Sequence, residues 1–288
     1  MRIIEEALAQ IGIDEEFETY ERLGGGDINE AYRLNTSEGS YFLKLKKKAP
    51  EAFFEAEKQG LDALINQAGV HAPKPLGLYR SDSSGYAGLL LEWIETDKTP
   101  ARQADLGYET AKLHRTGAGY YGYTSDTYIG ELPQPNGAFS SWLEYYRDRR
   151  IGKQAELAKN RGLLPVKRAE RLTKLREQLE RWIPAEPHAS LLHGDLWGGN
   201  WLAGPGGQPY FIDPSVLYGD RELDIAFSKL FGGFSAEFYS AYQADFPLAY
   251  NWKEREPLYQ LFYLLVHLNM FGEVYGKSVD RILKHYIG

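Results

Sequence analysis

Cysteine is absent from this chain of 288 residues, which excludes disulfides, thiolate metal sites, thiol nucleophiles and thiol redox switches. No run approaches the roughly 18 consecutive apolar residues that a membrane-spanning helix needs. The 33 basic residues are outnumbered by 40 acidic ones, and the net charge of −7 argues against nucleic acid as the main partner. Residues 1–17 are acidic and helix-patterned, unlike a signal peptide. We therefore expect a cytoplasmic protein with neither a membrane nor a nucleic-acid partner.

The composition that is present predicts a globular protein with a β-rich beginning. Hydrophobic residues make up 43% of the chain and aromatic residues 14%, which is enough for a large core and for two lobes. Strand patterns separated by Gly- or Ser-containing turns occur at 18–23, 29–35, 40–46, 76–80 and 86–93. Residues 51–67 carry apolar side chains at helical spacing. These patterns predict a small antiparallel five-stranded lobe with one helix.

The remainder of the chain is mainly helical in pattern. Helical periodicity covers 101–116, 139–159, 165–182, 221–231, 235–245 and 253–275. One Gly-rich interruption with short apolar strands lies at 189–214, and the best hinge is near Glu95–Pro100. We expect an α+β fold of two lobes, in which residues 1–95 form the first lobe and residues 96–288 the second.

The interruption contains three residues whose chemistry suits phosphoryl transfer. Asp195 and Asn200 stand five apart in an H-x-D-x-x-x-x-N pattern, and Asp213 ends a short apolar strand. Transfer of a phosphoryl group to an alcohol needs a carboxylate that orients the hydroxyl and accepts its proton, and oxygen ligands for Mg²⁺. We therefore assign Asp195 as the base and Asn200 and Asp213 as metal ligands. The alternative makes the three residues a turn former, a cap and an Asp-Pro turn.

Histidines near these positions receive structural roles. His193 stands two residues before Asp195, and we expect its ring to hydrogen-bond to backbone and shape the loop. His114 ends a helical pattern and His267 lies inside an apolar one, so both are expected to be packed or capping residues.

Groups suited to phosphate binding occur in the first third. Lys44 alternates with apolar neighbours, as a phosphate-pairing lysine on a strand requires. Glu57 shares the inward helix face with Phe54 and Leu61, whereas Glu55 projects elsewhere, so Glu57 is the predicted partner of Lys44. The segment after the first predicted strand is a glycine-rich loop whose backbone would allow close approach of phosphate oxygens. A plain hairpin turn is the alternative. The loop comprises Gly24, Gly25, Gly26, Asp27 and Ile28.

Together these residues resemble the fructosamine/ketosamine-3-kinase family, relatives of aminoglycoside and choline phosphotransferases within the protein-kinase-like fold. Residues 193–200 (HGDLWGGN) are similar to the family's HGDLWxGN motif, and residues 213–226 to its DP…YGxREx-D/E-L/I-A segment. Further family-like stretches are at 24–29, 54–57, 90–93, 113–114, 231–234 and 259–262. The resemblance spans nearly the whole chain.

The resemblance implies ATP- and Mg²⁺-dependent phosphorylation of a ketosamine hydroxyl, usually O3, in a fructosamine, ribulosamine or other glycated amine. It also implies that adenine hydrogen-bonds to the backbone near Glu92, Trp93 and Ile94. Asp27 is a departure, because some relatives carry cysteine or serine there. Only six residues separate Asp213 from Asp220, which leaves no room for the long activation segment of a protein kinase.

The substrate pocket has three candidate residues. Trp197 and Asp220 are candidate substrate contacts, and Trp142 is a candidate wall for which a core role is equally compatible. Asp220 could instead cap the helix that begins beside it. An aminoglycoside- or choline-type phosphotransferase and a nucleotide-binding pseudokinase remain alternatives.

Overall fold

A computed structural model describes residues 2–24, 29–96 and 102–288 of the chain. It divides into two compact units, the first formed by Met1–Arg102 with Trp201–Pro214 and the second by Gln103–Asn200 with Ser215–Gly288. The sequence places a single boundary at 95/96, whereas in these units residues 201–214 fold with the N-terminal part. The Phe211 N–H donates a 2.9 Å hydrogen bond to the His71 carbonyl, which ties this returning segment to the first unit.

The first unit contains the predicted five-stranded antiparallel sheet, with strand order β1-β2-β3-β5-β4. The predicted strands and helix are confirmed, and the helix ends in a π-helical turn, η1. Its elements are α1 (Arg2–Ile11), β1 (Phe17–Leu23), β2 (Glu30–Thr36), β3 (Ser40–Lys47), α2 (Phe53–Ala63), η1 (Leu64–Ala68), β4 (Pro75–Ser81), β5 (Tyr86–Glu92), β11 (Trp201–Ala203), η4 (Pro205–Gly207) and β12 (Pro209–Phe211).

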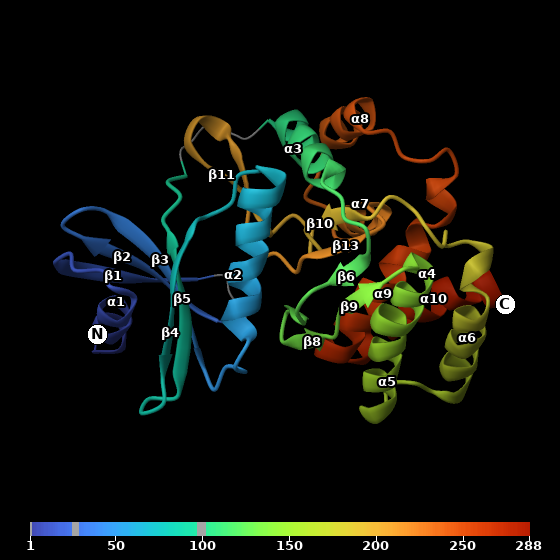
Figure 1. The fold of residues 1–288 in the computed structure, drawn as a ribbon. Helices are drawn as coiled ribbons and strands as arrows, with labels where there is room; N and C mark the ends of the chain where they lie inside the picture. Colours follow the sequence, from blue (N-terminus) through green and yellow to red (C-terminus); the bar gives the residue numbers. More distant parts are fainter. Residues whose placement is uncertain (1, 25–28, 97–101) are drawn as a thin grey trace. The chain divides into compact units, whose positions relative to one another are not determined.

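Within this unit, α1 and α2 lie on opposite faces of the sheet (Figure 1). The α1 face is apolar, because Ile4 and Leu8 of the helix pack with Leu43 and Leu45 of β3. Side chains alternate along a strand, so Lys44 points to the opposite face, where α2 lies. The core on one face thus fixes the direction of a charged side chain on the other.

The second unit is mainly helical and includes a small antiparallel sheet of order β10-β13-β6-β9. Its α-helices and 3-10 or π segments are α3 (Gln103–Arg115), α4 (Trp142–Tyr145), η2 (Tyr146–Gly152), α5 (Lys153–Asn160), α6 (Val166–Glu177), η3 (Leu179–Arg181), α7 (Glu222–Leu230), α8 (Ala236–Asp245), η5 (Trp252–Glu254), α9 (Glu256–Phe271), η6 (Glu273–Tyr275) and α10 (Gly276–Ile287). Its strands are β6 (Tyr121–Tyr123), β7 (Thr127–Ile129), β8 (Leu132–Gln134), β9 (Gly137–Phe139), β10 (Ser190–Leu192) and β13 (Leu217–Gly219).

The α+β class is confirmed, while several elements of the second unit go beyond the sequence-based expectation. Strands β6 to β9 and helix α10 are additional. The region 139–159 is helical only from Trp142 and contains the π-helical stretch η2. Among the described residues, no helix is both long and apolar enough to cross a membrane.

Candidate active site

Lys44 occupies the middle of β3 in the first unit. Its register partners are Ala31 on β2 and Leu89 on β5, so it is held in the interior of the sheet. The residue is 7% exposed, and its neighbours Leu43 and Leu45 belong to the apolar core on the other face. Burial of a lysine is costly unless the charge is paired, so its partners determine its state.

Two carboxylates hold the Lys44 ammonium group. Its Nζ lies 2.6 Å from Glu57 Oε1, which confirms the predicted pairing, and it also contacts Asp213 Oδ1. Glu55 instead accepts a hydrogen bond from Gln59. Burial would lower the pKa of Lys44, but the charges of Asp213 and Glu57 outweigh burial and raise that pKa. Lys44 is therefore a positive charge held in place by two carboxylates, Glu57 on α2 and Asp213 after β12.

Asp213 sits at the end of the β11–β12 hairpin segment of the same unit. Its backbone is left-handed, with φ of 54°, a conformation that aspartate tolerates better than most residues. The following Pro214 packs on α2, where a side-chain carbon at Gly60 would lie 3.0 Å from the proline ring. The side chain of Asp213 is 47% exposed. Its carboxylate thus lies beside Lys44 and remains accessible to solvent.

The other predicted nucleotide contacts lie partly outside the described residues. Gly24 follows β1, but Gly25, Gly26, Asp27 and Ile28 fall in the segment that the structure does not describe. At the end of β5, the Glu92 N–H donates to the Lys74 carbonyl at 3.0 Å. Trp93 stacks under the Arg33 guanidinium, 4.4 Å from the ring centroid. Ile94 lies against Gly204 of the β11–β12 turn.

In the second unit, Asp195 and Asn200 form one hydrogen-bonded loop. The Asn200 amide nitrogen donates to the Asp195 carboxylate at 2.8 Å and to its carbonyl at 2.9 Å. The Asn200 N–H also donates to the Trp197 carbonyl, which closes the turn. Five-residue spacing in the sequence thus becomes direct contact between the two polar side chains.

The residues before Asp195 are fixed by the backbone. Gly194 has φ of +80°, and a side chain there would overlap the Ser215 carbonyl oxygen, so only glycine fits. The His193 carbonyl accepts the Ser215 N–H at 2.8 Å. The Asp195 N–H donates to His193 Nδ1 at 3.2 Å. The expected loop-shaping role of His193 is confirmed.

The two candidate tryptophans differ in exposure. Trp197 is 39% exposed, and its indole covers Gly199, where a side chain would overlap the ring. Trp142 is fully buried and packs against Tyr145, Tyr146 and Tyr259. The core alternative therefore holds for Trp142, and Trp197 keeps an exposed surface beside the loop.

Asp220 lies in the interior, only 4% exposed. Its carboxylate accepts the Glu222 N–H at 3.0 Å and the Tyr259 hydroxyl at 2.6 Å. Burial, with the charge of Glu222, raises the pKa of Asp220 to about 6. These contacts correct the expectation of a substrate contact, because both carboxylate oxygens serve the start of α7 and the core.

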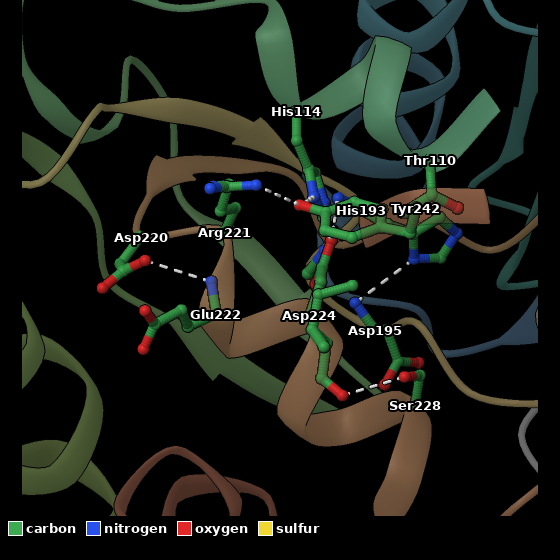
Figure 2. A network of polar contacts seen from close by, with 12 residues as sticks. Thr110, His114, His193, Asp195, Asp220, Arg221, Glu222, Asp224, Ser228 and Tyr242 are labelled. Carbon is green, nitrogen blue, oxygen red and sulfur yellow. Dashed lines mark hydrogen bonds and ion pairs between the residues drawn. The ribbon is translucent and has the colours of Figure 1, made fainter. Parts of the chain in front are cut away.

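Sequence reasoning missed two residues that hold the loop. Asp224 of α7 lies beside His193 (Figure 2) and accepts the backbone N–H groups of His193 and Gly194. The Tyr263 hydroxyl of α9 donates to the Gly194 carbonyl at 2.9 Å. An acidic residue in the first turn of a helix, directly followed by apolar residues, is the signal that could have indicated Asp224, since a buried carboxylate needs several donors.

Comparisons with known proteins identify the relatives of this chain. A family model described as fructosamine kinase matches residues 1–288. A protein of Enterococcus faecium named as a probable ketoamine kinase is 43% identical over 91% of this chain and 93% of its own. A Haemophilus somnus crystal structure, provisionally named fructosamine-3-kinase, has a TM-score of 0.87, 27% identity and coverage of 99% of this chain and 96% of its own.

A more distant solved structure shows the wider fold. An aminoglycoside phosphotransferase in ternary complex with ADP and hygromycin B has a TM-score of 0.68 at 13% identity, and the match covers 100% of both chains. This likeness concerns the fold alone. The match of the family model over the full length, together with the identity to the ketoamine kinase relative, shows that the chain belongs to the fructosamine kinase family.

Proposed function

We propose that the protein transfers the γ-phosphate of ATP to the O3 hydroxyl of a ketosamine and that Asp195 accepts the hydroxyl proton. The observation that carries the proposal is the hydrogen-bonded Asp195–Asn200 loop in a chain of the fructosamine kinase family. The acceptor oxygen bonds to the γ-phosphorus, the bond from that phosphorus to the β,γ-bridging oxygen breaks, and ADP leaves. The proton passes to the Asp195 carboxylate.

Side-chain and backbone groups of the first unit bind the nucleotide. Lys44, held by Glu57, contacts the α- and β-phosphates as a fixed positive charge. The glycine-rich segment Gly24–Ile28 is the second proposed phosphate-binding group, because its sequence is suited to bind phosphate oxygens. Adenine hydrogen-bonds to the backbone of Glu92–Ile94, and because the Glu92 N–H already donates to Lys74, the donor comes from Trp93 or Ile94.

Mg²⁺ is the proposed metal, with Asp213 and Asn200 as its protein ligands. When bound, Mg²⁺ neutralises charge on the phosphate oxygens. The donor chemistry fits this ion, because Asp213 offers a carboxylate that is about half exposed. The Asn200 amide nitrogen is turned toward Asp195, so its amide oxygen is the atom suited to a cation.

Trp197 is the proposed wall for the sugar, since its indole is exposed beside Asp195 and an aromatic face can cover a sugar ring or a protonated amine.

Choline- or aminoglycoside-type activity is less favoured because the full-length family match is to fructosamine kinase. A pseudokinase is disfavoured because the base, the lysine and both metal ligands are present. A cytoplasmic location stays a prediction.

A comparison of acceptors tests this function. ATP consumption is measured with Mg²⁺ on a small ketosamine, its parent ketose, choline and an aminoglycoside, and the new phosphate is located by NMR. We expect phosphorylation of the ketosamine at O3 and weak use of the ketose, which lacks the amine. Phosphorylation of choline or the aminoglycoside alone would overturn the ketosamine assignment. Absence of transfer to every acceptor would favour the pseudokinase alternative.

A further inference from the structure

The backbone just before Asp195 is held by one buried carboxylate. Asp224 is fully buried on α7, and its Oδ2 accepts the His193 N–H at 2.7 Å while its Oδ1 accepts the Gly194 N–H at 3.0 Å. These are the backbone N–H groups of the two residues that precede Asp195. The Asp224 carboxylate therefore positions the backbone that leads to Asp195, together with the Tyr263 contact to the Gly194 carbonyl.

A histidine from a distant helix completes the contacts of that carboxylate. His114, at the end of α3, is fully buried, and its Nε2 lies 3.1 Å from Asp224 Oδ2 (Figure 2). Burying a carboxylate is costly unless its oxygens are hydrogen-bonded, so this third contact offsets part of the cost of burying Asp224.

The contact of His114 with Tyr242 determines which ring nitrogen of His114 carries the proton. Tyr242 of α8 contacts His114 Nδ1 at 2.8 Å through its hydroxyl, and the Arg221 guanidinium donates to the same hydroxyl at 3.1 Å. Because the hydroxyl oxygen accepts from Arg221, its proton is available for Nδ1. Burial lowers the pKa of His114, although Asp224 acts in the opposite direction, which is consistent with a neutral ring protonated at Nε2. Nε2 is then the donor to Asp224.

We propose that His114 is a positioning residue for phosphoryl transfer, acting through Asp224 on the backbone that carries Asp195. The proposal rests on the proposed role of Asp195 as the base. His114 touches neither nucleotide nor acceptor in this account, so it affects turnover by placing the base. A misplacement of about 1 Å at a reacting group can lower the rate about 100-fold.

Two substitutions of His114 separate positioning from packing. The amide nitrogen of glutamine lies as many bonds from Cα as histidine Nε2, so His114→Gln keeps a donor for Asp224. The amide of asparagine lies one bond closer to the backbone, at the level of Nδ1, so His114→Asn keeps a polar group near Tyr242 but does not reach Asp224. Thr110→Val is a matched control at a buried position of the same helix, since the Thr110 hydroxyl bonds only to the Leu106 carbonyl among the contacts of its side chain that the structure describes.

The kinetic test compares kcat and the Mg·ATP dissociation constant of these variants on a small ketosamine. We expect His114→Asn to lower kcat about 10- to 100-fold with nucleotide affinity within about threefold. His114→Gln should recover most of kcat, and Thr110→Val should retain it. Equal kcat values for the Asn and Gln variants would overturn the proposal, as would a loss confined to nucleotide affinity.

Folding and the proposed function are checked separately. Circular dichroism and thermal melting establish that each variant is folded at the assay temperature. If His114→Asn does not fold, Tyr242→Phe replaces it. This substitution removes the hydroxyl that fixes the tautomer of His114 but keeps the aromatic ring of residue 242. A kcat of Tyr242→Phe equal to that of the wild type would then overturn the proposal. Asp195→Asn is assayed in parallel. Full activity of that variant would refute the proposed base, whereas an inactive Asp195→Asn with unaffected His114 variants would refute the positioning role alone.

Discussion

Lys44 shows how a single buried charge depends on its partners. The side chain leaves a β-sheet whose other face is an apolar core, and its ammonium group is retained because Glu57 and Asp213 both lie against it. Loss of one partner of a buried charge leaves the other under-compensated, which costs more than the pair contributes. Glu57 is the partner that belongs to a regular helix, so it sets where the lysine points.

Glu57→Gln should therefore weaken nucleotide binding. The substitution keeps the size of the side chain but removes the charge that orients Lys44, and we expect the Mg·ATP dissociation constant to rise about tenfold, within the range for hydrogen bonds to charged groups. Glu55→Gln is the matched control, because Glu55 lies on the same helix and its carboxylate accepts from Gln59. Calorimetric titration of both variants measures the effect. Equal affinities of the two variants would contradict the assignment.

Residue patterns predicted the local part of this site and missed the distant part. Spacing placed Asp195 with Asn200 and distinguished Glu57 from Glu55, because both relations follow from loop length or helical period. His114 and Asp224 are 110 positions apart in the sequence, and no period connects them. Asp220 was assigned to the substrate because its acidity is visible in the sequence, whereas its burial against Tyr259 is not.

At the scale of elements, predictability follows element length. The strands of the five-stranded sheet are seven or eight residues long, so alternation is visible in the sequence. Strands β6 to β9 are three residues each, too short for a period, and depend on tertiary pairing. Helix α10 begins after Gly272 and the short η6 turn, a break that hides its continuity with the preceding helical pattern.

The packing of α3 against α8 positions His114 beside Tyr242. A side chain at Gly107 of α3 would overlap the Phe238 carbonyl oxygen of α8, so the two helices meet at a glycine. Gly107→Ala gains about 1 kcal/mol of helix propensity, but overpacking costs about 1–3 kcal/mol or more. We expect a net loss of about 1–2 kcal/mol in the free energy of unfolding, because the contact is with backbone.

Urea denaturation of Gly107→Ala measures that loss. Gly39→Ala is the control, since it adds the same methyl group where no other atom lies within 4 Å and its φ is not left-handed. Its stability should stay within about 0.5 kcal/mol of wild type. A Gly107→Ala protein as stable as the control would show that α3 and α8 separate readily, and that this close approach does not fix His114.

At the scale of the whole molecule, the proposed roles divide between the two compact units. Lys44, Glu57 and Asp213 belong to the first unit, and Asp195, Asn200 and the Asp224 contacts belong to the second. Substitutions in the first unit are therefore expected to act on nucleotide affinity. Substitutions of Asp195 or of the residues in the Asp224 contacts of the second unit are expected to act on turnover. Substitution of Asn200, a proposed Mg²⁺ ligand, is expected to act on Mg·ATP binding as well.

The most direct test of the central claim, that Asp195 is the base for phosphate transfer from ATP, is a paired measurement on Asp195→Asn. We predict that kcat on a small ketosamine falls by at least about 100-fold, because the proton acceptor is lost, while the Mg·ATP dissociation constant stays at the wild-type value. Asp213→Ala, measured alongside, should weaken Mg·ATP binding itself. Turnover by Asp195→Asn near the wild-type rate would contradict the account.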